Sequence, residues 1–294
     1  MFGQSGFIAV DWGTTNRRAY RVGADGLHDA EFEDERGVLS IASGGFLKAA
    51  AEIRERLGDW PLLLAGMVGS TKGWVEAPYV PCPGGFSELA ANVAWAEPGR
   101  SAIVPGLSYL AGDRADVMRG EEVQMLGAVA SGLIPSDGLA CHPGTHNKWV
   151  LLKGGRIIAF RTIMTGELFN LLKHKGILAD WLQGPAEPGE AFGSGVRQGL
   201  KGTALTADLF AVRARVLLGE ARAEDAASFV SGLLIGADVL MGLKDGAGDV
   251  TVIGRPELTR LYAAAIAQTG RTAHEVDGEK AFLAGIVEIA RRMP

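Results

Sequence analysis

The chain has 294 residues, of which 47% are hydrophobic and 21% charged, a composition typical of a globular protein long enough to form two cores. Its 29 Lys and Arg residues against 34 Asp and Glu residues give a net charge of −5, and no dense basic run occurs. These values argue against nucleic-acid binding and favour a small-molecule partner. No cationic stretch precedes an apolar run at Met1–Gly6, so we expect no secretory signal and a cytoplasmic protein. The longest apolar segment, Ala226–Leu243, contains Asp238, which favours a buried helix over a membrane span.

The first part of the sequence predicts three antiparallel strands, then a helix and a buried strand. Short Gly-rich turns separate the strands, and apolar residues in the helix repeat at spacings of three and four. In order, the predicted elements are strands at Phe7–Asp11, Arg18–Val22 and Leu27–Glu33, a helix capped by Ser43 that ends at Gly58–Asp59, and a strand at Leu62–Ala65.

The middle of the sequence repeats this order of elements. Three strands are expected again, separated by a Gly-Thr turn and a Gly-Gly turn, and a helix begins near Gly166. The predicted strands are Leu139–His142, Lys148–Lys153 and Arg156–Thr162. An ancient duplication accounts for the repeated order.

The remaining sequence predicts alternating helices and strands, which indicates an α/β architecture. The helices are expected at Thr206–Leu218, Ala223–Leu243, Pro256–Thr269 and Gly278–Arg292, and the strands at Val250–Ile253 and Ala273–Val276. We place a domain boundary near Pro105–Gly106, which gives domains 1–106 and 107–294; the last helix either stays with the second domain or returns to the first. A ligand cleft is expected between the two domains.

Each half of the chain has one Gly-Thr turn, formed by Gly13, Thr14, Thr15 and Asn16 in the first half and by Gly144, Thr145, His146 and Asn147 in the second. Backbone N–H groups and hydroxyls in such turns can bind phosphate oxygens. Asp11 comes just before the first turn, where its carboxylate would hold a hydrated Mg²⁺. The alternative is that these residues only form side-chain-stabilised turns.

Other familiar nucleotide and hydrolase motifs are absent from the sequence, including the P-loop, the dinucleotide fingerprint, the nucleophile elbow and the zincin motif. His142 and His146 are four residues apart, but Pro143 and Gly144 between them argue against a helix that would direct both at one metal ion.

Six segments resemble a known family. The segment IAVDWGTTNRRAYRV (8–22) resembles the first phosphate loop of the sugar kinase, actin and heat-shock chaperone superfamily. Five more are similar to segments of the 2-dehydro-3-deoxygalactonokinase family and occur in order along nearly the whole chain. They are AGMVGSTKGWVEAPYVPCP (65–83), VMRGEEVQMLGA (117–128), PGTHNKWV (143–150), FRTIMTGELFNLL (160–172) and FVSGLLIGADV (229–239).

The resemblance implies two ribonuclease H-like (actin-like ATPase) domains with a central cleft, and phosphorylation of 2-dehydro-3-deoxy-D-galactonate at its 6-hydroxyl in galactonate degradation. ATP and Mg²⁺ are the implied cofactors. Gly120–Glu122 is similar to the Gly-Asp segment that supplies the base in related carbohydrate kinases. We favour Glu121 as this base, with Glu122 and Asp116 as competitors, while acidic residues at a helix start also stabilise the helix dipole without any catalytic role.

The acidic substrate requires a cation for its carboxylate, and the candidates are Arg119, Arg161, Lys72 and Lys148. The other residues expected on the substrate side are Met67, Gly69, Ser70 and Trp74. On the adenosine side the resemblance indicates Gly254, although related proteins usually have a second glycine where this chain has Arg255. Each of these side chains has an alternative as a core or surface residue.

Two rival functions remain open at this stage. One is a kinase for another 2-keto-3-deoxy sugar acid, such as the gluconate epimer. The other is a nucleotide-binding regulator that keeps the fold without the transfer chemistry, because fold alone does not determine function. A homodimer also stays open.

Overall fold

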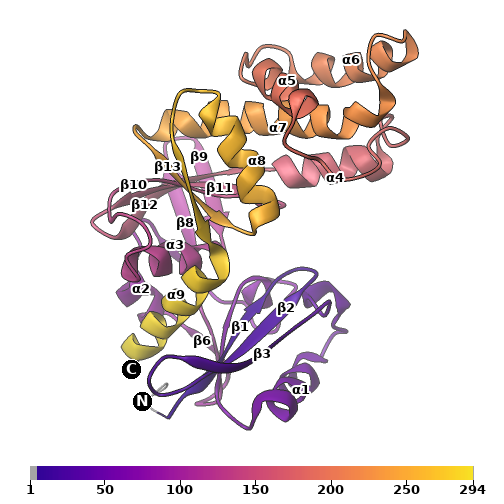
Figure 1. Cartoon of the computed structure of the whole chain (residues 1–294). Helices are drawn as coiled ribbons and strands as arrows, with labels where there is room; N and C mark the ends of the chain where they lie inside the picture. Colours follow the sequence, from indigo (N-terminus) through magenta and orange to yellow (C-terminus); the bar gives the residue numbers. More distant parts are fainter. Residues whose placement is uncertain (1–4, 294) are drawn as a thin grey trace. The chain divides into compact units, whose positions relative to one another are not determined.

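The computed structural model describes residues 5–293, so the first four residues, where no secretory signal is expected, lie outside the described part. The chain forms two compact units (Figure 1). Among the described residues, unit 1 contains 5–136, 153–159 and 278–293, and unit 2 contains 137–152 and 160–277.

Unit 1 is built on a six-stranded mixed sheet with the order β3-β2-β1-β4-β7-β6. The first three strands form the predicted antiparallel meander, whereas β4 and β7 run parallel to β1. The strands are β1 (Phe7–Trp12), β2 (Arg17–Val22), β3 (His28–Asp34), β4 (Leu62–Ala65), β6 (Ala94–Glu97) and β7 (Ser101–Ile103).

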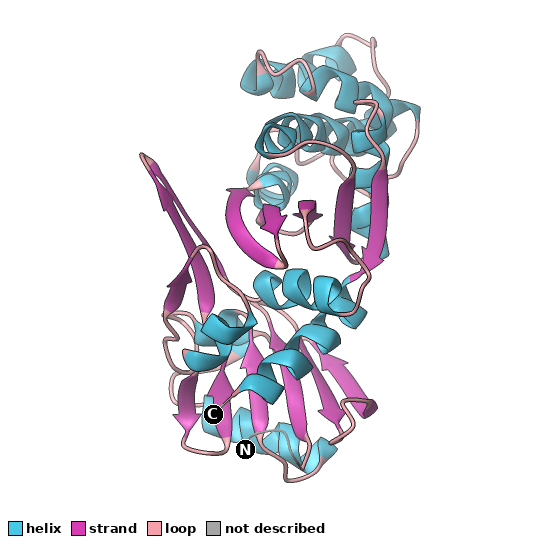
Figure 2. Ribbon diagram, turned by 90° about the vertical axis from the view of Figure 1, so that its left-hand side faces the viewer, coloured by secondary structure: helices cyan, strands magenta, loops and turns pink. Residues whose placement is uncertain are grey.

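Helices cover both faces of this sheet (Figures 1 and 2). Side chains alternate between the two faces of a strand, and Ile8, Val10 and Trp12 of β1 share a core with helix α1 (Phe46–Leu57). On the other face, Tyr20 contacts Phe282 of helix α9 (Gly278–Arg292), with ring centroids 6.1 Å apart. By the same alternation, Asp11 belongs to the α9 face at the carboxyl end of β1.

The rest of unit 1 comprises a three-stranded sheet of order β5-β8-β9 and helices that were not predicted, apart from the helix start considered at Glu121. These elements are β5 (Tyr79–Pro81), β8 (Gly106–Ala111), β9 (Arg114–Met118), α2 (Phe86–Ala91), α3 (Glu121–Ala130) and the short helices η1 (Val38–Ser40) and η2 (Met67–Gly69). Because β8 pairs with β5 and α3 packs on α9, residues 107–136 belong to the first unit. The structural division therefore follows Ser136 and not residue 106, and α9 belongs to unit 1.

Unit 2 repeats the sheet topology of unit 1, with the order β12-β11-β10-β13-β14. Here too the first strand, β10, pairs antiparallel with β11 and parallel with β13. The strands are β10 (Gly138–His142), β11 (Asn147–Lys153), β12 (Arg156–Ile163), β13 (Val250–Gly254) and β14 (Ala273–Asp277). The matching orders confirm the predicted α/β class with two ribonuclease H-like domains.

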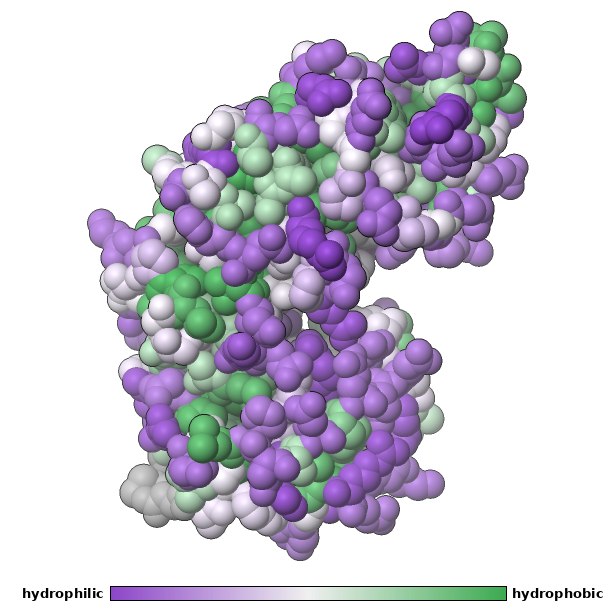
Figure 3. Space-filling model, in the orientation of Figure 1, coloured by the Kyte–Doolittle hydropathy of each residue, from purple (hydrophilic) through white to green (hydrophobic). Residues whose placement is uncertain are grey.

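The helices of unit 2 are α4 (Thr165–Lys175), α5 (Glu190–Gly199), α6 (Leu205–Leu217), α7 (Ala226–Gly242) and α8 (Pro256–Ala267), with short helices η3 (Ala223–Asp225) and η4 (Leu243–Asp245). Among the described residues, only Ala223–Asp245 has the length and hydropathy of a membrane span, and 67% of its apolar window is buried within the protein. This burial agrees with the predicted core helix. Figure 3 shows a hydrophobic patch near the end of α6, where Leu217 and Leu218 are exposed. Phe210, in the middle of this helix, is exposed as well.

One predicted cap is wrong. Helix α1 is preceded by Gly45, with no side-chain cap, because the chain turns at Gly44, whose φ is +78°, and first enters the helix at Phe46. Ser43 therefore lies outside the helix start. The N–H of Ala49 instead donates to the Gly45 carbonyl at 3.0 Å.

Candidate active site

The first Gly-Thr turn connects β1 to β2 in unit 1, and its carbonyl groups accept hydrogen bonds from residues 37–38. Val38 N–H donates to the Gly13 oxygen at 2.9 Å and Gly37 N–H to the Thr15 oxygen at 2.8 Å. A Cβ atom on Gly37 would lie 2.3 Å from the Thr14 oxygen, so only glycine allows this approach. Thr14 and Thr15 are exposed. The turn is thus rigid on its inner side and accessible on its outer side.

Asp11 lies beside this turn and forms an ion pair with Arg18 of β2. The distance from Arg18 Nη2 to Asp11 Oδ2 is 2.8 Å, and both side chains are about one-fifth exposed. The carboxylate is therefore fixed in direction while it remains within reach of water.

Three segments of unit 1 meet where β1 and β4 end. Gly66 follows β4, and a Cβ on it would lie 2.9 Å from the Trp12 oxygen and 3.6 Å from Asp11 Oδ1. Gly120, just before α3, is packed against Gly66, because a Cβ on Gly120 would lie 3.1 Å from the Gly66 Cα. Asp11 and the start of α3 are therefore brought together, although they are more than 100 positions apart in the sequence.

The two glutamates at the start of α3 have different surroundings. Glu122 is fully buried, and its oxygens accept hydrogen bonds from Gly120 N–H at 2.8 and 2.9 Å. Burial, as the larger cause, and the negative charge of the neighbouring Glu121 together raise the pKa of Glu122 to about 8. Glu121 is partly exposed and accepts a hydrogen bond from Arg119 N–H at 3.1 Å. Asp116, on β9, accepts a hydrogen bond from Val117 N–H.

Arg119 contacts the segment 69–79, which follows β4. Its Nη2 donates to the Ala77 oxygen at 2.8 Å, and its guanidinium lies 4.3 Å from the centre of the Tyr79 ring. Nε and Nη1 are buried without a hydrogen-bond partner. A Cβ on Gly69 would lie 2.8 Å from Nη1, so Gly69 makes room for this guanidinium.

A cavity of about 470 Å³ in unit 1 contains two of the predicted substrate residues. Lys72 and Trp74 line it together with Ser43, Phe46 and Thr71. The Trp74 ring stacks on Phe46 at 6.5 Å between centroids. The neighbouring predicted residues stand outside the lining: Met67 packs against the core, and Ser70 Oγ accepts a hydrogen bond from Lys72 N–H at 3.3 Å.

The second Gly-Thr turn connects β10 to β11 in unit 2 and packs against the start of α4. Glu167 N–H donates to the Thr145 oxygen at 2.9 Å, and His146 forms an ion pair with Glu167. A Cβ on Gly166 would lie 2.4 Å from the Gly144 oxygen. Lys148, which is buried, donates from Nζ to the His146 oxygen at 3.0 Å. Thr145 and His146 remain exposed, as in the first turn.

A buried carboxylate under this turn was not assigned a role by sequence reasoning. Asp238 of α7 is fully buried and accepts side-chain hydrogen bonds from four residues. The donors are Asn147 Nδ2 at 2.9 Å, Trp149 Nε1 at 2.6 Å, Tyr262 Oη at 2.6 Å and Thr165 Oγ1. Burial raises the pKa of Asp238, while the four donors oppose that shift. The signal in the sequence was an acidic residue in the middle of an apolar helix.

A cavity of about 300 Å³ adjoins the second turn. Its walls are largely apolar and come from α4, α7 and α8. The lining residues include Gly144, Thr165, Phe169, Ser231, Leu234, Leu258, Leu261 and Tyr262. Gly254 ends β13 near the turn, since a Cβ on it would lie 3.8 Å from Pro143 Cδ. Arg255 precedes α8, whose first turns form one wall.

Arg161 lies apart from these features. Its guanidinium makes two hydrogen bonds to Asp245, at 2.7 and 2.9 Å. A bidentate pair of this kind already satisfies a carboxylate within the protein. Of the four cations considered for the substrate, Lys72 is the one that lines the unit 1 cavity, among the residues that the structure describes.

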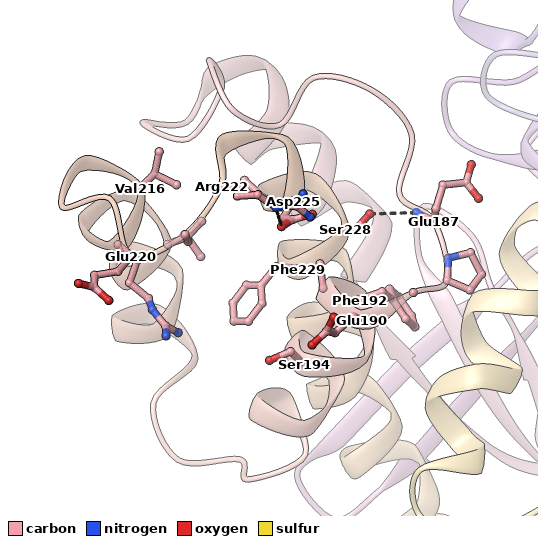
Figure 4. A pocket seen from close by; sticks show the side chains of 17 residues that line it. Glu187, Glu190, Phe192, Ser194, Val216, Glu220, Arg222, Asp225, Ser228 and Phe229 are labelled. Carbon is pink, nitrogen blue, oxygen red and sulfur yellow. Dashed lines mark hydrogen bonds and ion pairs between the residues drawn. The ribbon is translucent and has the colours of Figure 1, made fainter.

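A larger cavity, of about 680 Å³, lies among α5, α6 and α7 (Figure 4). Phe192 and Phe229 are among its lining residues, and Arg222 forms an ion pair with Asp225 at its edge. None of the predicted site residues lines it.

Residues 5–293 contain no group of three or more His, Cys, Asp or Glu side chains suited to hold a metal ion. Asp11 beside an exposed Gly-Thr turn is nevertheless compatible with Mg²⁺, which keeps several waters and takes few protein ligands when phosphates are present.

Comparison with known proteins covers nearly the whole chain. The profile of the 2-keto-3-deoxy-galactonokinase family matches residues 11–289. The 2-dehydro-3-deoxygalactonokinase of Escherichia coli (strain K12) is 38% identical over 97% of both chains. A solved structure from Sinorhizobium meliloti, described as a 2-dehydro-3-deoxygalactonokinase protein, is 34% identical, covers 97% of this chain and 98% of its own, and superposes with a TM-score of 0.90.

A more distant structure shares the fold alone. The activator of 2-hydroxyisocaproyl-CoA dehydratase from Clostridium difficile, solved with bound ADPNP, is 12% identical, with a TM-score of 0.52 over 97% of this chain and 94% of its own.

Proposed function

The chain belongs to the 2-keto-3-deoxy-galactonokinase family, and we propose that it is a cytoplasmic kinase that transfers the γ-phosphoryl group of ATP to the 6-hydroxyl of 2-dehydro-3-deoxy-D-galactonate. The products are ADP and the 6-phosphorylated acid. The observation that carries the proposal is the pair of exposed Gly-Thr turns at equivalent positions of two equivalent sheets.

Phosphate binding is assigned to the exposed Gly-Thr turn of each unit. The turns at Gly13–Asn16 and Gly144–His146 supply N–H groups and hydroxyls for the phosphates. The 300 Å³ cavity beside Gly144 would take the adenine, because its apolar walls suit a flat base and its volume is that of a small-ligand pocket. Gly254, at the end of β13, and Arg255, just before α8, are the proposed residues of the adenosine side.

Mg²⁺ would be held by Asp11 through water, and when bound it would neutralise charge on the transferred phosphoryl group. The Asp11 carboxylate lies beside the first turn and forms an ion pair with Arg18 at 2.8 Å. Thr14 and Thr15 lie in the same turn, so the metal and the phosphates would share one anchoring segment.

Glu121 is the proposed base. Proton transfer requires a carboxylate that can reach the substrate hydroxyl, and Glu121 is accessible at the start of α3, whereas both oxygens of Glu122 are bound to the Gly120 N–H. The proton of the 6-hydroxyl would pass to Glu121 as the oxygen attacks the γ-phosphorus. Glu122 and Asp116 remain as alternatives.

The substrate would enter beside Lys72 and Trp74. The ammonium group of Lys72 is the proposed partner of the sugar-acid carboxylate, and Trp74 would form a wall of the pocket. Gly69 makes room for the Arg119 guanidinium next to this segment. Met67 packs against the core, and Ser70 accepts a hydrogen bond from Lys72 N–H. Arg161 is assigned a structural role by its pairing with Asp245.

The proposal is tested by measuring ADP release with Mg²⁺ATP and a panel of 2-keto-3-deoxy acids, with the product mass determined. Turnover of the galacto acid, with one phosphoryl group added, is the expected result. Equal turnover of the gluco epimer would support a kinase of broader specificity. ATP binding without turnover of any acid would instead support the regulator.

A further inference from the structure

Asp238 connects elements that are distant in the sequence. Its carboxylate accepts hydrogen bonds from residues of β11, α4 and α8, and it lies on α7 itself. Asn147 is 91 positions away in the chain. With four side-chain donors, both oxygens of the buried carboxylate have hydrogen-bond partners. A buried polar network whose members are all hydrogen-bonded holds the surrounding structure in one well-defined geometry.

Two of these donors are connected to the second Gly-Thr turn. Asn147 directly follows His146, so its hydrogen bonds to both Asp238 oxygens, each 2.9 Å, fix the end of the turn. Thr165 begins α4, and the next two residues touch the turn: Gly166 by close backbone approach to the Gly144 oxygen, and Glu167 by its N–H to the Thr145 oxygen.

The same carboxylate also holds the walls of the adjoining cavity. Thr165 and Tyr262 both line the 300 Å³ cavity, and both donate their hydroxyl groups to Asp238 Oδ2. The turn and two cavity walls therefore share one anchoring group, although none of them is a neighbour of Asp238 in the sequence.

We propose that Asp238 is a positioning residue for the nucleotide: it holds the phosphate-binding turn and the base-binding cavity in the single geometry that lets one nucleotide occupy both. This inference rests on the proposed function for the assignment of the cavity to the base. Asp238 does not touch the nucleotide, and acts through Asn147, Thr165 and Tyr262.

The test is the affinity of the full-length protein for ADP with Mg²⁺, measured by calorimetry without the sugar acid. Asp238→Asn replaces one acceptor oxygen by a donor that faces other donors. We expect at least a tenfold loss of ADP affinity and a matching rise in KM for ATP, with KM for the sugar acid within twofold of wild type. A merely structural role would not raise KM for ATP while leaving KM for the sugar acid unchanged.

The matched control is Val239→Ala, the next residue of the same helix. Val239 is fully buried in the core of unit 2 and has no polar contact to the network. This variant is expected to lower the melting temperature while ADP affinity stays within twofold. The proposal is overturned if Asp238→Asn binds ADP as tightly as wild type, or if Val239→Ala weakens binding to the same extent.

If Asp238→Asn does not fold, Thr165→Val and Tyr262→Phe replace it in the test. Each removes one hydrogen-bond donor to Asp238 and keeps the side-chain shape. Each is expected to weaken ADP binding at least threefold, and wild-type affinity in both would overturn the proposal. Wild-type protein that binds ADP but phosphorylates no acid would refute the proposed function alone. Wild-type protein that binds no ADP would refute both.

Discussion

Gly127 of α3 and Gly285 of α9 lie in direct backbone contact where the two helices cross. A Cβ on Gly127 would lie 2.4 Å from the Gly285 nitrogen, and a Cβ on Gly285 would lie 2.0 Å from the Val123 oxygen. No side chain can shift to relieve such a clash, since the obstructing atoms belong to the backbone. This crossing therefore determines where α3, and with it Glu121, lies in unit 1.

Gly285→Ala should push the two helices apart. Overpacking of this kind destabilises by about 1–3 kcal/mol, and we expect that loss in urea denaturation, together with reduced turnover in ADP-release assays. Gly189→Ala is the control, because a Cβ there would meet nothing within 4 Å. Equal stability of the two variants would contradict the close crossing.

Asp11→Asn should leave the fold intact and impair metal use. A partly exposed ion pair such as Asp11–Arg18 contributes up to about 1 kcal/mol, so the melting temperature should change little. Since the carboxylate would hold the metal through water, we expect activity or Mg²⁺ affinity to fall by about 10–100-fold. Mg²⁺ titration of turnover measures this.

Arg18→Met is the matched control for Asp11. It breaks the same ion pair but keeps the carboxylate, so most of the turnover should remain. Near-normal turnover of Asp11→Asn would rule out the metal role. An equal loss of turnover in both variants would attribute the effect of Asp11→Asn to the broken ion pair and not to metal binding.

Glu121→Gln should slow phosphoryl transfer itself. A general base contributes about 10²–10⁴-fold, and single-turnover measurement separates this step from product release. Glu122→Gln should have a smaller effect on the transfer rate, because its side chain is buried against Gly120. If neither variant slows transfer, the base lies elsewhere. If only Glu122→Gln slows transfer, Glu122 is the base in place of Glu121.

Glu122 should make stability depend on pH. Its pKa is about 8 in the folded protein, against 4.5 for the free side chain. Between these values the folded state holds a proton that the unfolded chain has lost, so stability falls as the pH rises from 5 to 8, at up to about 1.4 kcal/mol per pH unit. Urea denaturation of wild type and Glu122→Gln across this range tests the slope. The variant should lack this contribution and gain stability relative to wild type at pH 8, and identical slopes would contradict the raised pKa.

Lys72→Met should weaken binding of the sugar acid but not of ATP. Loss of a charge-assisted hydrogen bond costs about 1.5–3 kcal/mol, which corresponds to a rise of roughly tenfold or more in KM for the acid. Lys48→Met is the control, since Lys48 is an exposed lysine of the same unit outside the cavity lining. Unchanged KM for the acid in Lys72→Met would remove this residue from the substrate site.

The sequence alone was sufficient for features that depend on near neighbours. The predicted strand at Leu62–Ala65 and helix at Gly278–Arg292 match the structure at both ends, because alternation and helical spacing are local patterns. The two Gly-Thr turns were located in the same way. Their equivalence was visible from the order of elements before any sheet was known.

Only the tertiary structure decided which distant residues meet. It assigned residues 107–136 to unit 1, because pairing of β8 with β5 and packing of α3 on α9 are long-range contacts. It also separated the surroundings of Glu121 and Glu122, which are adjacent and chemically identical in the sequence. Asp238 shows the physical reason most clearly: its partners lie up to 91 positions away, and a hydrogen bond between them exists only after packing has brought the donors around the carboxylate and excluded water.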